Sequence, residues 1–395
     1  MKSRLITKAT LLLCSRLNDP SDAPRPLSLS EYHQLAQWLD TFDQTLAALL
    51  RPDAKAVLRQ YPGADRILRL LRRIDDVDLL LEHWDRQGIW VLGEREPEFP
   101  ARLRQRLKIA CLPLLFGAGP RDTLDHGGLC VVGSRDSPAE SRDFAQAVGA
   151  RAGREGMVVI SSNMRGIDRE AISATRAAGG RVICVLSDSL EKAVGSKRYR
   201  EALATGRASL VTPFTPDIRF AVANAMRANR YQYGLADAAI VVETRQTGGI
   251  WSGAEENRKH KWVPAFVRTG ANVAPGNSAL LHLGLLPITL EDIEQCESLV
   301  QVLIERATSP PAPGVPRCER PDLYAIFLSE LVRLDESVTC SEDSVAHHFG
   351  IELLQARTWL ARAQGGLAAG APAFPAARPL AKLDHGQGFA RNEPL

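Results

Sequence analysis

Two turns in the sequence have the residue types that bind phosphate. They are Gly133-Ser134-Arg135 and Arg165-Gly166, and each follows a short apolar run. A glycine turn before a helix leaves backbone amides free, and a neighbouring guanidinium adds the charge and geometry that suit phosphate oxygens. We therefore expect a phosphate contact at each turn, with Gly166 letting the backbone come close to the ligand. For Arg135 the alternative is an ion pair with a local carboxylate such as Asp168.

A third polar group lies further along the chain and combines cations with aromatic rings. Arg227 and Arg230, with Asn229 between them, are expected to hold an adjoining phosphate. Tyr231 and Tyr233 offer ring faces on which the bases of a single strand can stack. Packing in the core at strand spacing is the alternative for the two tyrosines, and it stays open.

Apolar runs alternate with helical patterns around these turns. The runs expected to be strands are 89–93, 129–132, 157–160, 181–186, 209–212, 238–242 and 262–267. Continuous apolar strands separated by helices are typical of a parallel sheet covered on both faces. The pattern therefore predicts an α/β, Rossmann-like domain over residues 89–307. In such sheets ligands bind at the carboxyl ends of the strands, where both turns lie.

Residues 1–88 are expected to form a helical N-terminal domain. Apolar residues at helical spacing follow Ser28 and Ser30, so either serine is a candidate N-cap. Gly88 is expected to end the last of these helices. A row of arginines on one helix is interpreted as a solvated face in preference to a nucleic-acid contact. This row contains Arg66, Arg69, Arg72 and Arg73.

The C-terminal part begins with a proline-rich linker at residues 308–321, which is expected to be extended and partly stiff. Residues 322–395 are predicted to form a winged-helix or helix-turn-helix module with a loose tail, because short helical patterns flank a glycine turn. The polar residues on the expected recognition helix are Gln355, Arg357 and Arg362. Contact with duplex DNA and contact with a partner protein are equal alternatives for this module.

Composition limits the class of protein. The net charge of +3 is too small to indicate nucleic-acid binding, which would need a local basic patch. The seven cysteines are odd in number and scattered, as is typical of a reducing compartment, and no Cys or His spacing predicts a metal site. The apolar run near the N-terminus is too short for a signal peptide. We therefore expect a cytoplasmic protein with no membrane contact and no cofactor.

Taken in order, the motifs resemble those of the DNA-processing protein A (DprA/Smf) family. The matching pieces, found between residues 89 and 288, are Val132-Gly133-Ser134-Arg135, Arg165-Gly166-Ile167-Asp168 and Arg227-Ala228-Asn229-Arg230. The resemblance implies a Rossmann-like domain that binds single-stranded DNA in DNA processing and recombination, often as a homodimer and without catalysis. It also implies a RecA-type recombinase as partner, a helical N-terminal domain and a C-terminal winged helix.

Two loops depart from the family pattern. Residues 162–168 replace the family's Gly-Leu-Ala-Leu-Gly-Ile-Asp and add bulk and a cation. Residues 247–254 replace its Ser-Gly-Ser-Leu-Ile-Thr-Ala region. These differences favour a divergent paralogue. DprA-like proteins also occur as the antitoxin or regulator of anti-phage defence modules, so restraint of a toxin partner is one alternative function.

An enzymatic alternative comes from residues 248–255. Gly248, Gly249, Ser252 and Glu255 resemble the Gly-Gly-x-Gly-Thr-x-x-Glu loop of the nucleotide phosphoribohydrolases, or LOG family. In that family a glutamate and an arginine cleave the N-glycosidic bond of a nucleotide. Trp251 stands where the loop has a glycine, and its bulk would crowd a nucleotide phosphate. Binding of single-stranded DNA is therefore the preferred function, and nucleotide N-glycosidase activity ranks below it.

Overall fold

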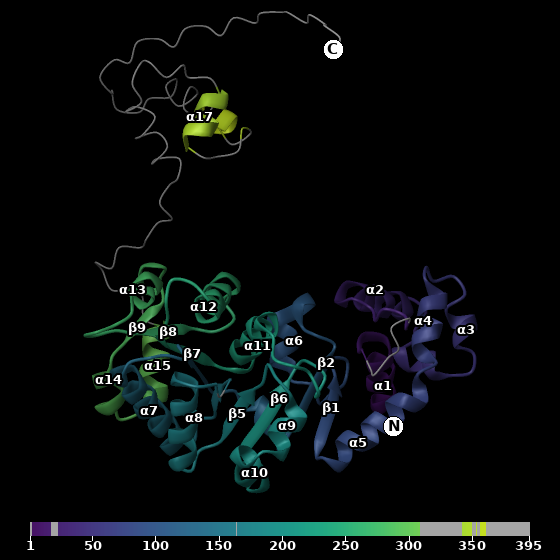
Figure 1. Cartoon of the computed structure of the whole chain (residues 1–395), viewed down its shortest axis with the longest axis horizontal. Coiled ribbons are helices and arrows are strands. Elements are labelled where there is room, and N and C mark those ends of the chain that lie inside the picture. The colour runs from purple at the N-terminus through teal and green to yellow at the C-terminus, as the bar shows by residue number, and fades with distance from the viewer. Residues whose placement is uncertain are drawn as a thin grey trace, which may run out of the picture. The chain divides into compact units, whose positions relative to one another are not determined.

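The computed structural model describes residues 2–16, 23–162, 164–308, 342–349, 353 and 356–360. The chain divides into two compact units, Met1–Arg317 and Cys318–Leu395. In the first unit nine strands form one sheet (Figure 1). No helix in the described ranges is long and apolar enough to cross a membrane.

The sheet is mostly parallel, with the strand order β1-β2-β6-β5-β4-β3-β7-β8-β9. Strand β2 pairs antiparallel with both β1 and β6, and the other pairs are parallel. The predicted α/β, Rossmann-like sheet is confirmed, although β2 and the short strand β9 have no counterpart among the predicted runs. The strands are β1 (Ile89–Gly93), β2 (Leu114–Ala118), β3 (Leu129–Gly133), β4 (Val159–Ser161), β5 (Val182–Val185), β6 (Ala208–Thr212), β7 (Ala238–Glu243), β8 (Ala265–Arg268) and β9 (Leu286–Ile288).

Alternate residues of the central strands face two separate hydrophobic cores, so both faces of the sheet are covered. Val131 and Ile240 belong to one core, and their neighbours Val132 and Val241 belong to the other. Strands buried on both faces must be continuously apolar. The first core includes α7 (Ala139–Arg154), α8 (Ile167–Ala177), α9 (Leu190–Gly195) and α10 (Lys197–Ala204); the second includes α6 (Ala101–Leu107), α11 (Val222–Leu235), α12 (Gly249–His260) and α13 (Pro275–His282).

Five helices from the N-terminal part gather beside the β1 edge of the sheet (Figure 1). Leu11, Leu12 and Leu13 are fully buried in the core that also contains Ile89 of β1. These helices and the sheet therefore share one hydrophobic core. The helices are α1 (Lys2–Cys14), α2 (Leu29–Asp40), α3 (Ala54–Val57), α4 (Ala64–Leu71) and α5 (Ile74–Arg86).

Local contacts explain where the N-terminal helices begin, end and join. Ser28, one of the two predicted candidates, caps α2 in a capping box with Glu31. Gly88, at φ +73, follows the end of α5. Two members of the arginine row hold this region together: Arg66 donates to Glu31 at 2.6 Å, and Arg73 donates to backbone carbonyls, including that of Leu70 at 3.2 Å. This role differs from a purely solvated face.

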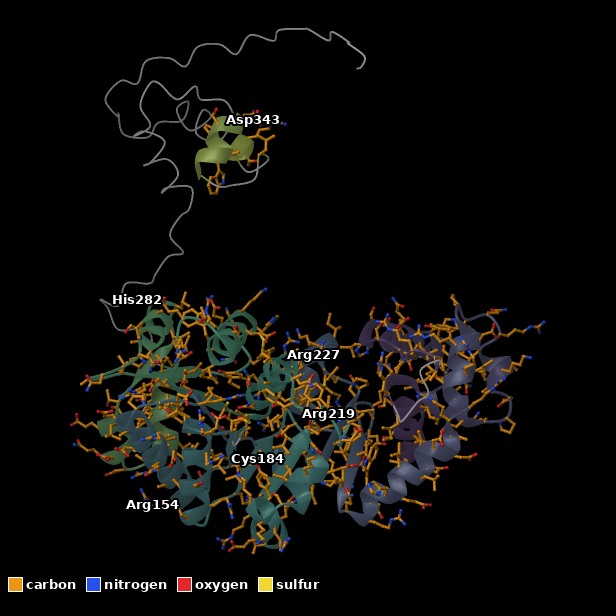
Figure 2. The ribbon with its side chains drawn as sticks, in the orientation of Figure 1. Arg154, Cys184, Arg219, Arg227, His282 and Asp343 are labelled. Carbon is orange, nitrogen blue, oxygen red and sulfur yellow. The ribbon has the colours of Figure 1, made fainter. Side chains whose placement is uncertain are left out.

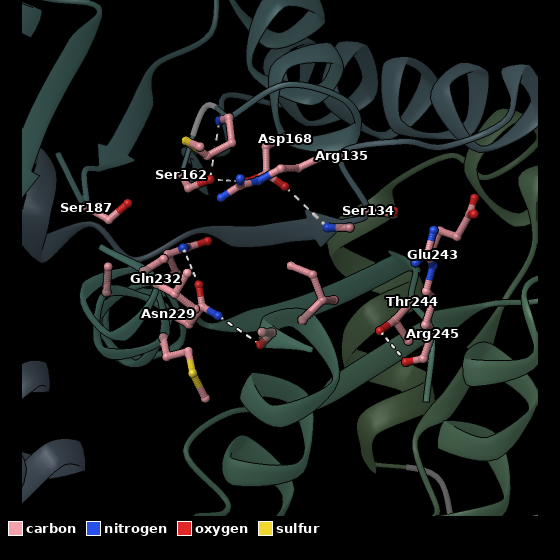
Figure 3. A pocket seen from close by; sticks show the side chains of 18 of the residues that line it. Ser134, Arg135, Ser162, Asp168, Ser187, Asn229, Gln232, Glu243, Thr244 and Arg245 are labelled. Atoms are coloured by element: carbon pink, nitrogen blue, oxygen red, sulfur yellow. Dashed lines mark hydrogen bonds between the residues drawn. The ribbon is translucent and has the colours of Figure 1, made fainter. Parts of the chain in front are cut away.

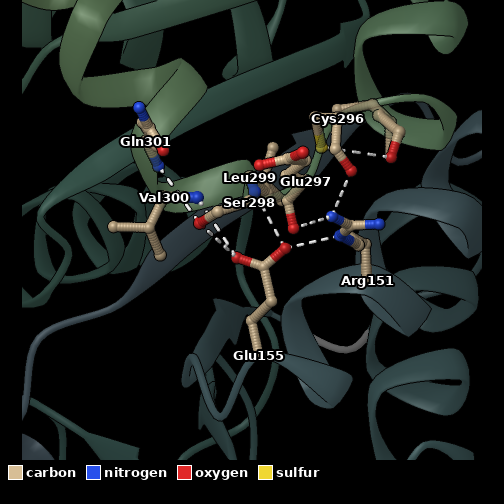
Figure 4. Close-up of polar contacts among 9 residues, drawn as sticks. Arg151, Glu155, Cys296, Glu297, Ser298, Leu299, Val300 and Gln301 are labelled. Carbon is tan, nitrogen blue, oxygen red and sulfur yellow. Dashed lines mark hydrogen bonds and ion pairs between the residues drawn. The ribbon is translucent and has the colours of Figure 1, made fainter.

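The last helices of the first unit are α14 (Leu290–Glu294) and α15 (Leu299–Thr308), and Glu155 anchors the second of them (Figure 4). The Glu155 carboxylate accepts hydrogen bonds from the amides of Leu299 at 2.8 Å and Val300 at 3.3 Å. A negative charge at a helix N-terminus is stabilising. Arg151 donates to Glu155 and to backbone carbonyls just before α15, so α7 fixes the start of this helix.

In the second unit the described residues include helix α17 (Glu342–Phe349) and a helical segment at 356–360. Arg357 in that segment pairs with Glu342 at 2.8 Å. Gln355 and Arg362 lie outside the described residues, as does most of the proline-rich linker. The recognition-helix contacts therefore stay a prediction.

Candidate nucleic-acid interface

The order of the strands creates a switch point between β3 and β7. From β3 the chain adds β4, β5 and β6 on one side, and later adds β7, β8 and β9 on the other side. Loops that leave β3 and β7 therefore diverge and open a crevice at the carboxyl ends of these strands, where ligands bind in such sheets. A pocket of roughly 390 Å³ lies there, lined by residues from the ends of β3, β4 and β7 and from α11 and α12 (Figure 3).

The turn after β3 is fastened to its neighbours. The Gly133 amide donates to Oδ1 of Asp168 at 3.3 Å, and the Ser134 amide donates to the Glu243 carbonyl at 3.0 Å. Asp168 also accepts a hydrogen bond from the hydroxyl of Ser162. Two amides that the sequence suggested were free for an anion are thus occupied. Their bonds instead join the three loops that surround the pocket.

Gly166 serves the contact between two loops, which corrects the expectation that it faces a ligand. Its φ is +86, and a Cβ at this position would lie 2.4 Å from the carbonyl oxygen of Ser134 and 2.5 Å from that of Arg135. The close approach that only glycine permits is therefore made by the β3 loop. Arg165 pairs with Asp136, and both side chains are exposed; Asp136 lines the pocket, whereas Arg165 does not.

Arg135 is exposed at the pocket and stacks on Phe220. The guanidinium carbon lies 5.4 Å from the centre of the Phe220 ring, a cation–π distance. Phe220 belongs to the loop between β6 and α11 and is 44% exposed. Within the part of the chain that the structure describes, Arg135 forms no ion pair. Asp168, its alternative partner, is buried and bonded to Gly133 and Ser162 instead.

Helix α11 brings one of its three predicted phosphate ligands to the pocket. Asn229 lines the pocket, and its Nδ2 donates to the Gly249 carbonyl at 3.0 Å. Arg227 is exposed outside the pocket lining (Figure 2), and Arg230 pairs with Glu256 at 2.8 Å. Arg227 and Arg230 are three positions apart and share a face of α11, whereas Asn229 points in another direction, so the three side chains do not converge on one phosphate.

The prediction that Tyr231 and Tyr233 stack on bases is wrong. Each side chain is 1% exposed and belongs to the second core. The hydroxyl of Tyr231 accepts a hydrogen bond from the Leu112 amide at 2.7 Å, and burial raises the pKa of both phenols well above the usual value. These residues lie in the last part of α11, where residues 231–235 are all buried, so neither ring is open to a base.

Phe220, Gln232 and Glu243 are among the pocket residues that were not predicted. Phe220 had a sequence signal, because it lies next to Arg219 in a loop after an apolar strand. Gln232 is 1% exposed inside α11, and Glu243 ends β7. The position of a polar residue inside a helix or at a strand end does not reveal that a pocket lies beside it, so neither residue had a signal.

Asp168 contributes a buried carboxyl group to the pocket. Burial raises its pKa from 3.8 to about 6, while hydrogen bonds from Ser162 and Gly133 act in the opposite direction. The described residues contain no group of three or more His, Cys, Asp or Glu that could hold a metal ion.

The residues of the enzymatic alternative separate along α12. Gly249 lines the pocket, but Gly248, Ser252 and Glu255 do not. Trp251 packs against the second core. The glutamate that this alternative requires is therefore not among the pocket residues.

The fold and the switch-point pocket define an α/β protein of the Rossmann-like class with a pocket at the carboxyl ends of its strands. The model of the family described as DNA recombination-mediator protein A matches residues 90–284, which include every residue that lines the pocket. Residues 90–284 therefore belong to the DNA recombination-mediator protein A (DprA) family. The resemblance found in the sequence is confirmed, and a role in DNA processing follows from the family.

Solved structures of two relatives resemble this chain. DNA processing protein A from Streptococcus pneumoniae is 20% identical, with 69% of this chain and 94% of that chain covered and a TM-score of 0.55. The protein from Helicobacter pylori, described for its single-stranded DNA binding mode, is 19% identical, with 55% and 96% covered and a TM-score of 0.45. The first likeness supports the fold. A search of curated proteins gave no match.

Proposed function

We propose that this chain binds single-stranded DNA across the pocket at the carboxyl ends of β3 and β7, without chemistry of its own. Family membership supports DNA as the ligand, and the switch point supports this position for it. The DNA backbone follows exposed cations around the pocket, while the bases meet Phe220 and the pocket walls.

The observation that carries the proposal is the exposed ring of Phe220 with the Arg135 guanidinium stacked on it. Aromatic rings combined with cations bind single strands without sequence preference, because every base has a face that stacks. Val222 and Met226, 70% and 44% exposed, extend this apolar surface beside the pocket. Exposed apolar side chains that gather in one place mark a binding surface.

Further cations lie around the pocket and in a neighbouring depression, toward the ends of β5 and β6. Arg245 lines the pocket, and Arg219 (labelled in Figure 2) lines a second depression of roughly 450 Å³, which shares Phe220 with the first. Lys192 and the carboxylate of Asp188 also line this depression, which lies beyond β5 and β6. We expect the strand to pass over Phe220 into it, because cations that follow the phosphates supply most of the affinity for nucleic acid.

Fluorescence anisotropy with a labelled single strand of mixed sequence, and with a duplex of the same length, tests this function. We expect the single strand to bind more tightly than the duplex. Phe220→Ala should weaken single-strand binding about tenfold, since one stacked base contributes roughly 1–3 kcal/mol. Phe42→Ala, at a phenylalanine that is 54% exposed in the N-terminal part, is the matched control. A preference for the duplex, or full affinity in the Phe220 variant, would contradict the proposal.

The enzymatic alternative has a direct assay. We expect the full-length protein to release no free base from nucleoside monophosphates, because Glu255 lies outside the pocket lining. If the wild-type protein releases free base and Glu255→Ala does not, the function is N-glycosidase activity and the binding proposal is wrong. Homodimerisation, a RecA-type recombinase partner and the antitoxin role stay predictions from the resemblance.

A further inference from the structure

Two helices of the second core end beside each other, and a lysine follows each of them. Helices α6 and α12 both pack on α11 (Figure 1), and Nε1 of Trp262, just after α12, donates to the Arg106 carbonyl in α6 at 2.8 Å. Lys108 caps the end of α6 at φ +51, and Lys261 caps the end of α12 at φ +52. Glycine is the usual residue at a helix end with positive φ, because a side chain is strained there. Both positions thus carry a lysine at a cost to the backbone.

These lysines belong to a larger group of cations. We call it the α12 basic patch, and its exposed members are Lys108, Arg258, Lys259, His260 and Lys261. In the part of the chain that the structure describes, none of the five forms an ion pair, and Glu256 of the same helix pairs with Arg230 at 2.8 Å instead. One or two cations are enough to complement the negative end of a helix. The patch exceeds that need and is open to a polyanion.

The turn that carries Lys261 is held in place by side chains. Nδ2 of Asn257 donates to the Val263 carbonyl at 2.9 Å, and the Val263 amide donates to Oδ1 of Asn257 at 3.1 Å. The imidazole of His260 stacks on the indole of Trp262, with ring centres 5.2 Å apart and planes 11° apart. This face of the indole is covered, and its N–H group is already bonded. The patch therefore offers fixed charges without a tryptophan face that is free for a base.

We propose that the α12 basic patch binds the backbone of duplex DNA, so that the protein recognises a junction between single-stranded and duplex DNA. This inference rests on the proposed binding of single-stranded DNA at the pocket. A single strand needs rings on which its bases stack, whereas the bases of a duplex stack on one another and its phosphates need only cations. Ile109, next to Lys108, is 81% exposed. Apolar side chains of this kind contact the minor groove of a duplex.

The distance between the patch and the pocket suits a junction. Helix α12 begins with Gly249 at the pocket and ends with His260, so the two sites lie roughly 17 Å apart along the helix. About five base-paired nucleotides span this distance, since each strand of a duplex rises about 3.4 Å per nucleotide. Duplex that begins close to the pocket can therefore reach the patch. The second contact is then intramolecular, which raises the affinity of the whole molecule.

Fluorescence anisotropy with the full-length protein tests the junction. One labelled strand is measured alone, paired over its 5′ half, paired over its 3′ half, and fully paired. We expect one of the half-paired forms to bind about five- to tenfold more tightly than the strand alone. Pairing removes part of the single-stranded DNA, so a gain in affinity requires a contact with the duplex half.

A double variant locates that contact. Arg258→Gln combined with Lys259→Gln should abolish the gain and leave the affinity for the strand alone unchanged. For the half-paired form it should flatten the dependence of log affinity on log salt by about 1.8, because each duplex phosphate contact contributes about 0.9. Lys55→Gln combined with Arg59→Gln is the control, since it removes the same charge from exposed positions in and after α3. The control should keep the gain.

Lys261→Asn separates binding from folding. Asparagine adopts a positive φ more readily than lysine does, so this variant should be at least as stable as the wild type in thermal unfolding. It should nevertheless lose about 0.9 of the salt dependence for the half-paired form. A salt dependence equal to that of the wild type would exclude this lysine from the contact and contradict the proposal.

Equal affinities for the strand alone and for both half-paired forms overturn the junction, and an acidic protein is then the partner that the patch suits. A gain that persists in the Arg258 and Lys259 double variant places the duplex contact elsewhere and also overturns the proposal. In both cases single-strand binding at the pocket stands. If the strand alone does not bind at low salt, the proposed function fails and this inference fails with it.

Discussion

Arg135 and Arg165 follow two adjacent strands but meet different partners, since Arg135 stacks on Phe220 and Arg165 pairs with Asp136. Arg135→Ala should flatten the dependence of log affinity on log salt by about 0.7, the value for one single-strand phosphate contact. Arg165→Ala should flatten it less, because Asp136 already neutralises part of that charge. Salt titrations measure both slopes, with the exposed Arg69→Ala as control. A larger change in the Arg165 variant would show that the pair with Asp136 opens to bind DNA.

Asp168 makes the stability of the protein depend on pH. Its pKa is 3.8 when unfolded and about 6 when buried, so its favourable contribution is complete below pH 3.8 and is lost as the pH rises through 6. The loss is on the order of 3 kcal/mol. Asp168→Asn keeps the shape and removes this titration. Thermal unfolding should therefore show similar stability for the two proteins at pH 4 and a more stable variant at pH 7.5.

A constant difference between Asp168→Asn and the wild type across this pH range would contradict the raised pKa. A variant that is less stable only at neutral pH would mean that the charged form of Asp168 stabilises the loops around the pocket.

The sequence predicted which element carries a functional residue better than it predicted which side chains that residue contacts. The sequence places Ser134, Arg135 and Asn229 in loops or helices that reach the carboxyl end of the sheet, and all three line the pocket. It does not show that Asp136 stands beside Arg165, because ion pairs form between loops whose spacing depends on the fold. Tyr231 is buried because residues distant in the sequence pack around its ring. The spacing of residues along the chain does not show how many such neighbours a ring will have.

At the scale of elements, α7 and α8 pack so closely that a side chain at Gly149 would not fit. A Cβ there would lie 2.3 Å from the carbonyl oxygen of Ala171. Gly149→Ala should destabilise the protein by about 1–3 kcal/mol, because overpacking exceeds the gain in helix propensity. Urea unfolding measures this change. Gly195→Ala, at a position with nothing within 4 Å, should be neutral or slightly stabilising, and equal stability of both variants would refute the close packing.

Strands β1 and β3 to β8 were predictable because each lies in both cores and must be apolar throughout, as Val131 and Val132 illustrate. Strand β2 also lies in both cores but was not among the predicted runs. β9 was missed because it has three residues, of which Pro287 is one. A proline interrupts the hydrogen bonding of a strand, so it argues against a strand in any sequence pattern.

At the scale of the whole molecule, the sequence predicts a parallel sheet but not the order of its strands. The order depends on which face each connecting helix covers, and helices with similar apolar stripes suit either face. The antiparallel strands β1 and β2 extend the sheet beyond β6, and the N-terminal helices pack against them. We retain the boundary near residue 88 as a proposal about domains, although Leu12 and Ile89 share one core.

The proposed division near residue 307 predicts the behaviour of two truncated proteins. A chain ending at Thr308 keeps α15 and its contacts with Glu155, so the first unit should unfold at an unchanged temperature. It should also keep single-strand affinity within about twofold, because Arg135, Phe220 and the pocket remain. A chain ending at Glu294 loses Leu299 and Leu303, which are buried, and should be less stable by about 3–6 kcal/mol.

Thermal unfolding and anisotropy of the two truncated proteins, each beside the full-length chain, measure these effects. The chain ending at Thr308 should lose only what the second unit contributes, such as a contact with duplex DNA or with a partner protein through Arg357. That loss would appear in duplex binding or in a pull-down from the host, while single-strand binding persists. If the chain ending at Thr308 folds but no longer binds the single strand, residues beyond it complete the DNA site. The pocket between β3 and β7 would then be only part of the interface, and the proposed division of the chain would be mistaken.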